Sequence, residues 1–393
     1  MLLQFSIKNY KTFKDIATLS LIASNYDKLN LENNTFLNRK FNYRLLKSAV
    51  LYGANASGKS KFFEAYHAFR NIVFNSSRES LANERIEVTP FLLDSKSEKE
   101  PTSFEIVFIN GTIQFRYGFE ANKEKVNREW LYSKTSTKEI ELFYRVNQKI
   151  TSHSEIDIAN DLIEKNMIRE NALLLSVLAQ FNDKTARKIF NSLRNINSIS
   201  GIRQEGYEGY TIHQLDNEKN VKKQEIIDFL NVADFGIEDL KVNKLDVTNL
   251  PEDMPEPFKE MIRKSDSKNK LIYEDVTAFR RKFRNGKPTK SIVAFSMDED
   301  ESSGTIKYFA LSGPILDTLK SGATLFVDEL DSQLHPSLIK HLIKLFNSKE
   351  FNPKNAQLVF NTHESNLLST GVFRRDQIWF TEKDHFGCAH IFS

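Results

Sequence analysis

Residues 53–60 have the types and spacing of a phosphate-binding loop. They read Gly-Ala-Asn-Ala-Ser-Gly-Lys-Ser and fit the pattern G-x-x-x-x-G-K-[ST]. The mostly apolar residues 48–52 predict a buried strand before the loop, and residues 61–66 predict the start of a helix after it, which is the context this motif needs. Glycines let the loop curl so that successive N–H groups point at a di- or triphosphate, and the helix N-terminus adds partial positive charge. The predicted phosphate-binding residues are Gly53, Asn55, Ser57, Gly58, Lys59 and Ser60.

Two side chains of this loop predict the chemistry of a nucleoside triphosphate with a magnesium ion. The ammonium group of Lys59 would reach the β- and γ-phosphates, and the hydroxyl of Ser60 would bind Mg²⁺. ATP and Mg²⁺ are therefore the predicted cofactors, with Lys59 among the catalytic residues.

A second candidate site follows the apolar run at 325–327, where Asp328 and Glu329 stand together. An apolar strand that ends in two acids is the Walker B pattern. Asp328 would hold the Mg²⁺ shell, and Glu329 would orient and deprotonate an attacking water. The acids could instead cap the next helix, because acids favour a helix N-terminus. The P-loop in the same chain favours the magnesium interpretation.

Two weaker signals complete the candidate set. His363 follows the apolar strand predicted at 357–360, where it could hydrogen-bond the γ-phosphate and position water, or could simply be a loop histidine bonded to backbone. Ser303 and Gly304 precede a predicted helix at 306–319, an arrangement that either binds an anion or is a plain serine cap. The remaining histidines show no spacing typical of metal ligands.

The composition is that of an ordinary globular protein. Of the 393 residues, 27% are charged and 40% are hydrophobic, and 55 basic against 52 acidic residues give a net charge of +3. That balance neither requires nor excludes a nucleic-acid partner. A single cysteine, Cys388, excludes an internal disulfide, no apolar run has the length of a membrane span, and the first residues lack a signal-peptide pattern. We therefore expect a cytoplasmic location without membrane contact.

The hydrophobic periodicity predicts a head whose two parts are far apart in the sequence. Strand patterns dominate residues 1–150, which carry the P-loop, and helical patterns dominate 151–268, while 269–393 alternate strands and helices. Neither end carries a complete parallel sheet, so both must fold together. The predicted fold class is α/β, a mixed sheet with flanking helices, interrupted by a mainly helical insertion.

The order of these motifs resembles the ATP-binding-cassette (ABC) ATPases of the SMC, RecF and OLD branch. The run Asp-Glu-Leu-Asp-Ser-Gln-Leu-His-Pro at 328–336 looks like the D-E-x-D-x-x-L-H-P run of AbiL/RloA-like ATP-binding proteins from abortive-infection loci. Segments 9–13, 303–309 and 376–384 are similar to that group as well, whereas the insertion is not, and no Q-loop glutamine is assigned.

The resemblance implies an ABC-type head that hydrolyses ATP in a head-to-tail homodimer or a higher assembly, in which Ser303 and Gly304 bind ATP held on the P-loop of a second copy. It also implies a two-component antiphage system with a separate effector, often a TOPRIM-type nuclease. Two other hypotheses stay open. One is a RecF/SMC-like ATPase of DNA repair or maintenance, and the other is a scaffold in which ATP is only a structural ligand.

Residues 276–297 contain no acid and six basic residues, namely Arg280, Arg281, Lys282, Arg284, Lys287 and Lys290. They could contact nucleic-acid phosphates. A solvated hairpin that turns at Asn285-Gly286 is the preferred interpretation.

Overall fold

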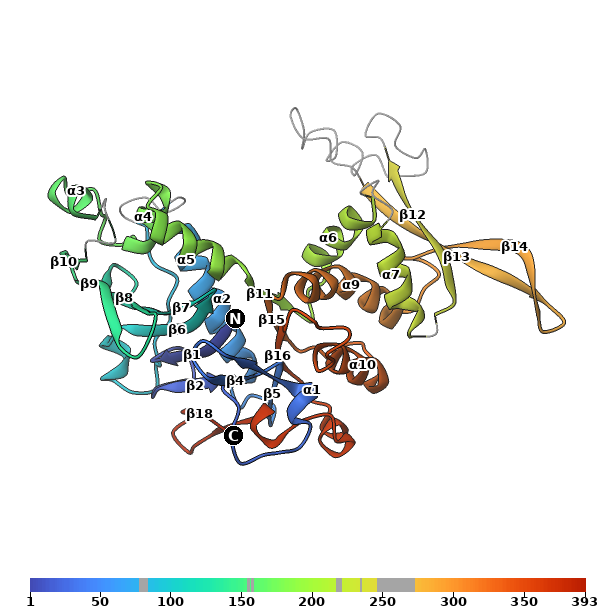
Figure 1. Ribbon diagram of the computed structural model, residues 1–393, viewed down its shortest axis with the longest axis horizontal. Helices are drawn as coiled ribbons and strands as arrows, with labels where there is room; N and C mark the ends of the chain where they lie inside the picture. Colours follow the sequence, from blue (N-terminus) through green and yellow to red (C-terminus); the bar gives the residue numbers. More distant parts are fainter. Residues whose placement is uncertain (78–83, 154–155, 157–158, 217–220, 234, 246–272) are drawn as a thin grey trace. The chain divides into compact units, whose positions relative to one another are not determined.

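The computed structural model describes residues 1–77, 84–153, 156, 159–216, 221–233, 235–245 and 273–393. The chain forms two compact units (Figure 1). Unit 1 contains Met1–Ile202, Thr318–Ser332 and Ile339–Ser393, and unit 2 contains Arg203–Asp317 and Gln333–Leu338. The domain boundaries at 150 and 268 stay predictions.

Unit 1 contains a seven-stranded antiparallel sheet in the order β10-β9-β8-β7-β6-β1-β2. Alternating buried and half-buried residues along β6 show the period of two that gives a strand one core face. The predicted hairpin at Asn110-Gly111 is confirmed, with Gly111 at φ +61° in the turn. The strands are β1 (Leu2–Lys8), β2 (Ala17–Ser20), β6 (Thr102–Asn110), β7 (Ile113–Ala121), β8 (Val126–Lys134), β9 (Glu139–Val146) and β10 (Lys149–Ser152).

The second sheet of unit 1 joins the two ends of the chain. Its order is β11-β15-β16-β5-β17-β18, and all neighbours are parallel except β17 and β18. The strands are β5 (Ser48–Gly53), β11 (Ile196–Ser200), β15 (Thr324–Asp328), β16 (Gln357–Asn361), β17 (Ile378–Lys383) and β18 (Ala389–Phe392). Because β5 lies between β16 and β17, the prediction that both ends fold as one head is confirmed.

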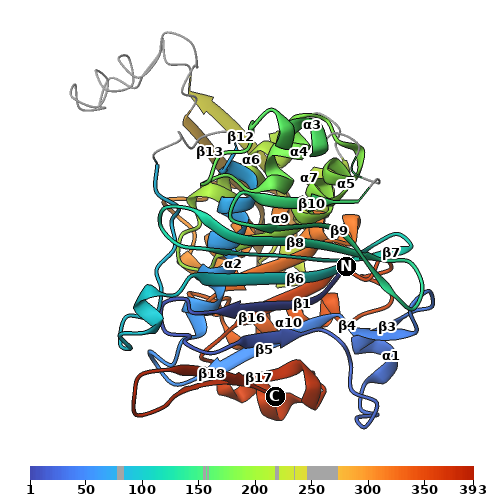
Figure 2. The ribbon, with the colours of Figure 1, turned by 90° about the vertical axis from the view of Figure 1, so that its left-hand side faces the viewer.

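Helix α2 (Lys59–Asn75) packs on both sheets through one aromatic face. Tyr66 stacks on Phe326 of β15 at a centroid distance of 4.0 Å and meets Phe5 of β1 edge-on at 5.1 Å. Phe69, one helical turn after Tyr66, stacks on Phe119 of β7 at 5.8 Å. Burying each such ring contributes about 1.5–3 kcal/mol, so this face fixes the helix that follows the P-loop. Figure 2 shows α2 beside β6 and β1.

Shorter elements complete unit 1. The helix α4 (Leu174–Gln180) begins where the buried carboxylate of Glu129 accepts hydrogen bonds from the N–H groups of Leu174 and Leu175, at 2.6 and 3.0 Å. The other elements are α1 (Leu31–Asn34), β3 (Thr35–Asn38), β4 (Tyr43–Leu46), η1 (Ser97–Lys99), α3 (Ala159–Glu164), α4 (Leu174–Gln180), α5 (Lys184–Arg194), η2 (Ser365–Thr370) and η3 (Arg375–Gln377). Helix α10 (Pro336–Phe346) has its first residues in unit 2 and the rest in unit 1.

Unit 2 packs helices around the first part of α9 (Ser303–Ser321) and carries a small antiparallel sheet in the order β12-β13-β14. Thr211 Oγ1 donates to the carbonyl of Ala310 at 2.7 Å, and Tyr308 stacks on Phe229 at 4.6 Å. The remaining elements of this unit are α6 (Glu205–Asp216), α7 (Val221–Asn231), β12 (Ile237–Leu245), β13 (Tyr273–Arg284) and β14 (Lys287–Ser296).

The predicted fold class is confirmed as α/β, with a mixed sheet, flanking helices and a long insertion between the P-loop and the acids at 328–329. The mainly helical prediction for 151–268 agrees with α3 to α7 but misses the strands β11 and β12. The segment 251–257, whose prolines predict an exposed loop, lies outside the described residues. Among the helices that the structure describes, none combines the length and the apolar character that crossing a membrane requires.

Candidate active site

The P-loop joins β5 to α2 and needs glycine at both of its ends. A Cβ on Gly53 would lie 2.4 Å from the carbonyl oxygen of Thr381 on the neighbouring strand β17. Gly58 has φ +120°, and a Cβ there would lie 2.9 Å from the Cβ of Ala389. Side chains at these positions would clash with the sheet or strain the backbone, so the loop conformation depends on both glycines.

The middle of the loop has one anchored side chain and one exposed residue. Ser57 is buried, and its Oγ shares a 2.6 Å hydrogen bond with Thr381 Oγ1. Asn55 is exposed. The hydroxyl of Ser57 therefore fastens the loop to β17, and phosphate binding by Ser57 and Asn55 stays a prediction.

Lys59 is the first residue of α2, and its side chain folds back over the loop. Its Nζ donates to the carbonyl oxygens of Gly53 at 2.6 Å and Ala54 at 3.1 Å, and the residue is only 4% exposed. Burial lowers the pKa of this ammonium group, and the negative charge of Glu329 is the largest opposing influence. A phosphate would replace the two carbonyl partners with charged oxygens.

The acids after β15 meet the start of α2. Ser60 Oγ donates to Glu329 Oε1 at 3.3 Å. Burial is the main cause that raises the pKa of Asp328, and the Glu329 carboxylate adds to it. Two carboxylates in one partly buried place repel each other, and a cation between them would remove that cost. The oxygen donors of Ser60 and Asp328 are of the kind that Mg²⁺ prefers, so the residues present fit this ion.

Asn361, the last residue of β16, was not predicted and holds both acids in place. Its Nδ2 donates to Asp328 Oδ1 at 2.6 Å, while its Oδ1 accepts the backbone N–H of Glu329. The residue is fully buried, and Glu329 adopts φ +55°, a backbone conformation that this bond supports. In the sequence, Asn361 is only the end of an apolar strand, so no local pattern marks it.

Gly201, which follows β11, is a second residue that sequence reasoning missed. Its N–H donates to the carbonyl oxygen of Asp328 at 2.5 Å. A Cβ at this position would lie 1.9 Å from the carbonyl oxygen of Glu329. The turn that carries the acids is therefore held from one side by β16 and from the other by the end of β11.

His363 lies two residues beyond β16 and is exposed. Its backbone N–H donates to Asp331 Oδ2 at 2.8 Å, which links it to the loop after the acids. The structure thus brings Lys59, Ser60, Asp328 and Glu329 together and places His363 on an adjoining loop. Contact of His363 with a γ-phosphate stays a prediction.

Ser303 and Gly304 lie in unit 2, at the first turn of α9. The capping residue is Ser302, whose Oγ accepts the N–H of Thr305 at 3.2 Å. Ser303 is not needed as the cap and is exposed, while a Cβ on Gly304 would lie 3.1 Å from the carbonyl oxygen of Gln333. Binding of a nucleotide by this pair stays a prediction.

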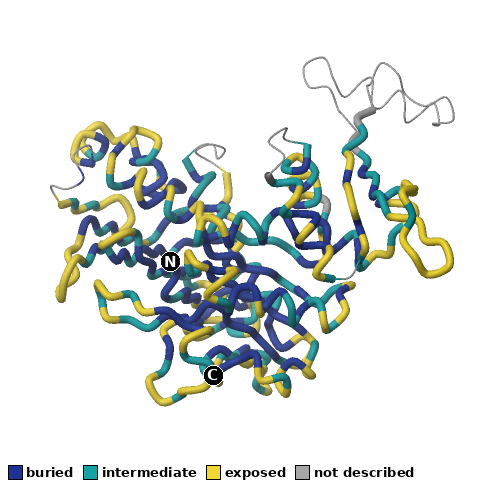
Figure 3. Tube along the Cα trace, turned by 45° about the vertical axis from the view of Figure 1, so that its right-hand side comes forward, coloured by how far each residue is buried: buried dark blue, intermediate teal, exposed yellow. Residues whose placement is uncertain are grey.

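The basic stretch at 276–297 forms a hairpin with its turn at Asn285-Gly286, as predicted. Two of its basic side chains have acidic partners, since Arg280 pairs with Glu301 at 2.8 Å and Arg281 with Glu238 at 2.5 Å. The outer half of the hairpin is exposed, as the yellow tube in Figure 3 shows. These facts agree with the preferred interpretation of a solvated hairpin, and nucleic-acid contact stays a prediction.

The profile of one protein family matches residues 48–369. It is described as "AAA domain, putative AbiEii toxin, Type IV TA system". The chain belongs to this family. The matched segment begins with β5 and contains the P-loop, Ser303-Gly304, both acids and His363. The predicted P-loop ATPase head is confirmed by the family and by the arrangement of these residues.

Comparison with solved structures gives similar chains that include the following three, and each alignment covers the whole of this chain. The SMC head domain from Thermotoga maritima has 12% identity and a TM-score of 0.44, with 98% of its chain covered. The SMC head domain of Pyrococcus furiosus, bound to the C-terminal domain of ScpA, has 14% identity and a TM-score of 0.44 over 95% of its chain. The recombination mediator RecF with ATPrS has 15% identity and a TM-score of 0.41 over 98% of its chain. Comparison with curated proteins gives no significant match.

Proposed function

We propose that this chain binds and hydrolyses ATP in a Mg²⁺-dependent reaction. The supporting observation is the contact between the start of the P-loop helix and the two acids. Ser60 Oγ lies 3.3 Å from Glu329 Oε1, and Asp328 directly precedes Glu329 at the end of β15. The hydroxyl is at the end of the loop that would cradle the phosphates, which supports a role for the acids beside the γ-phosphate and its attacking water.

Each of these residues has a distinct role in the proposal. Lys59 binds the β- and γ-phosphates, while Ser60 and Asp328 hold Mg²⁺, which neutralises charge on the phosphates when it is bound. Glu329 takes the proton of the attacking water, and Asn361 keeps its backbone in position through the bond to the Glu329 N–H. His363 positions the water or the γ-phosphate from the adjoining loop.

We further propose that the active form is a head-to-tail homodimer. Ser303 of one copy would bind the ATP held by Lys59 of the other copy. Support comes from the capping of α9 by Ser302, which leaves the exposed hydroxyl of Ser303 available at the first turn. A helix N-terminus with such a hydroxyl favours a bound phosphate group.

The proposed biological role is the sensor or regulator of a two-component antiphage abortive-infection system in the cytoplasm. ATP state in this subunit would control a toxic partner, such as a TOPRIM-type nuclease. The family description names a putative AbiEii toxin and a type IV toxin–antitoxin system, which supports a place in a toxic defence pair. A RecF/SMC-like role in DNA repair is less favoured, and hydrolysis that DNA stimulates without any partner would support it instead.

The decisive experiment compares the wild-type chain with Glu329→Gln, and with Glu382→Gln as a control at an exposed position on β17. Glu329→Gln should still bind ATP, hydrolyse it about 100-fold more slowly or worse, and accumulate as a dimer with Mg²⁺ and ATP. Rates of phosphate release and the mass measured by light scattering report the two effects. Hydrolysis at the wild-type rate in Glu329→Gln would refute the assigned base.

The dimer is tested separately with Ser303→Arg, in which a bulky side chain blocks the face of α9. This variant should bind ATP as the wild type does, remain a monomer with ATP, and hydrolyse it slowly. Wild-type activity at monomer concentrations would contradict the trans arrangement without affecting the assignment of Lys59, Ser60, Asp328 and Glu329.

A further inference from the structure

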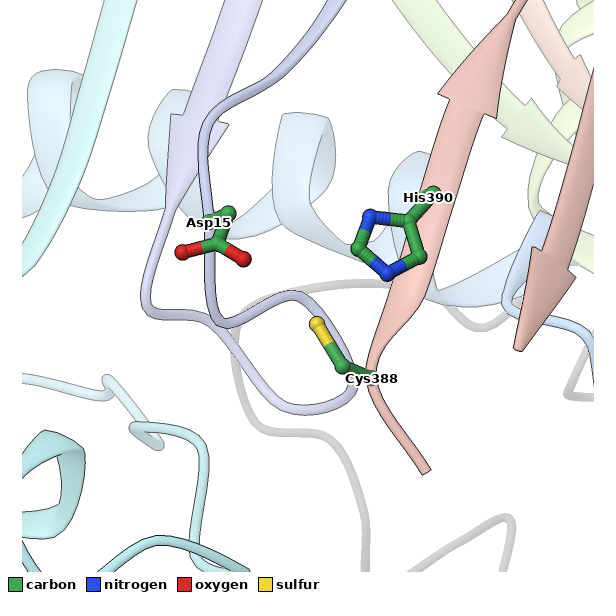
Figure 4. A group of neighbouring side chains, drawn as sticks. All are labelled: Asp15, Cys388 and His390. Atoms are coloured by element: carbon green, nitrogen blue, oxygen red, sulfur yellow. The ribbon is translucent and has the colours of Figure 1, made fainter. Parts of the chain in front are cut away.

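Three potential metal ligands from opposite ends of the chain meet beside β18 (Figure 4). They are the Cys388 thiol, a ring nitrogen of His390 and a carboxylate oxygen of Asp15, and these donor atoms all lie within 4.8 Å of one another. Cys388 is buried, with 3% exposure, whereas the side chains of Asp15 and His390 are open to solvent. The group is separate from Ser60 and Asp328, the residues assigned to Mg²⁺.

The backbone brings these ligands together. Cys388 and His390 flank Ala389 at the start of β18, and residues two apart lie on the same side of an extended segment. The N–H of Ala389 donates to the carbonyl oxygen of Thr12 at 2.8 Å, which fixes β18 against the loop that carries Asp15.

A single carboxylate, Asp384, orients both of the ligands on the β18 side. Its Oδ1 accepts the backbone N–H of Cys388 at 2.9 Å and so shapes the turn before β18. Its Oδ2 lies 3.3 Å from His390 Nε2. A carboxylate on one ring nitrogen of a histidine fixes the ring and leaves the other nitrogen to coordinate a metal.

The chemistry of the donors selects the metal. One thiolate, one imidazole and one carboxylate suit a borderline divalent ion such as Zn²⁺, whereas Mg²⁺ prefers oxygen ligands alone. Tetrahedral zinc with its usual bond lengths would place these donors about 3.3–3.6 Å apart. The exposed side chain of Asp15 can rotate to close the remaining distance. The neighbouring Lys14 has its charge paired with Asp94.

We propose that Cys388, His390 and Asp15 bind Zn²⁺, with a water molecule as the fourth ligand and Asp384 as the residue that orients His390. The ion would tie β18 to the loop after β1. Both segments pack against the P-loop, because a Cβ on Gly58 would lie 2.9 Å from Ala389 Cβ and 3.3 Å from the ring of Phe13. The zinc site would thus stabilise β18 and the loop after β1, the two segments against which Gly58 packs.

Cobalt provides a direct test, because a Co²⁺–thiolate bond gives a charge-transfer absorption band in the near ultraviolet. Cys388 is the single cysteine of the chain, so this band reports this site and no other. Titration of the tag-free, reduced, full-length chain with Co²⁺ should give the band, saturate at one equivalent and be reversed by one equivalent of Zn²⁺. Absence of the band in the folded wild-type chain would overturn the proposal.

Variants test whether the other ligands take part. Cys388→Ser should abolish the band, and Asp15→Asn, His390→Asn and Asp384→Asn should each weaken Zn²⁺ binding about tenfold or more, measured by competition with a chromophoric chelator. His385→Asn, at an exposed position in the same turn, is the matched control and should bind as the wild type does. Wild-type affinity in both Asp15→Asn and His390→Asn would show an adventitious thiol-bound ion and refute the site. Circular dichroism verifies that each variant is folded.

Discussion

Replacing Asn361 with alanine should impair the acids after β15 without touching either of them. The side chain of Asn361 is fully buried and makes two hydrogen bonds, one to Asp328 Oδ1 at 2.6 Å and one from the N–H of Glu329. In Asn361→Ala both groups lose the hydrogen bond to Asn361, and the left-handed backbone of Glu329 loses its support.

The expected cost follows from these two bonds. A lost hydrogen bond to a carboxylate costs about 1.5–3 kcal/mol, and an unpaired buried N–H costs about 1–3 kcal/mol. Asp328 and Glu329 are both half-buried, so water replaces part of what is lost. We therefore expect the free energy of unfolding in urea to fall by about 2–4 kcal/mol.

The same change should shift the pH dependence of the proposed ATPase. Burial raises the pKa of Asp328, and the bond from Asn361 is the largest influence that lowers it. Without that bond the pKa of Asp328 rises further, so the carboxylate becomes protonated at a higher pH as the solution is acidified. Because only the ionised carboxylate holds Mg²⁺ well, the acid limb of the rate profile should move to higher pH.

The matched control is Asn352→Ala. Asn352 is also fully buried, and its side chain bonds to the backbone of Phe346 and Ala356, at 2.7–2.9 Å. Asn352→Ala should lower the free energy of unfolding by a similar amount and leave the acid limb of the rate profile at the wild-type pH. The reasoning is wrong if Asn361→Ala keeps the wild-type acid limb, or if both variants move it equally.

Three further changes test other parts of unit 1. Gly53→Ala should reduce ATP affinity at least about tenfold in calorimetry while the chain stays folded, since its Cβ would lie 2.4 Å from the carbonyl oxygen of Thr381; normal binding would contradict this account of the loop. Arg145→Met should lower the free energy of unfolding in urea by about 3–5 kcal/mol, because the fully buried Glu129 lies 3.7 Å from Arg145 and would lose its counter-charge. An unchanged free energy of unfolding would argue against a charged pair. Burial lowers the pKa of Lys47 from 10.5 to about 8, so the unfolded chain binds more protons between these values and stability should rise with pH across that window. Lys47→Met should remove this rise and add about 1–3 kcal/mol of stability at pH 7, and an unchanged pH slope in urea titrations would refute it.

Local patterns predicted the parts of the site that lie within a single strand–loop–helix unit. The P-loop and the acids at 328–329 each carry their own strand, and apolar runs of this kind predict buried parallel strands whatever surrounds them. The same apolar runs predicted that strands from both ends of the chain form one sheet, since neither end carries enough parallel strands to complete it alone.

The parts that were missed depend on pairing across long stretches of chain. Strand β11 reads Ile-Asn-Ser-Ile-Ser and lies at a sheet edge, where polar residues are tolerated, so its pattern does not differ from a loop after a helix. Asn361 looks like an ordinary strand end until β15 lies beside β16. The approach of Asp15 to Cys388 requires the hydrogen bond from Ala389 to Thr12, which no sequence spacing reveals.

The tips of β15 and β16 form one hydrogen-bonded unit, and this matters for a protein proposed to report its nucleotide state. Asn361 holds Asp328 and Glu329, its carbonyl accepts the N–H of Leu330 at 3.2 Å, and Asp331 accepts the N–H of His363 at 2.8 Å. A displacement of His363 on loss of the γ-phosphate would therefore pull on Asp331 and on the turn that carries Glu329. In the proposed ATPase, the residue that senses the γ-phosphate and the residue that activates water cannot move independently, so hydrolysis itself would change the loop after β15.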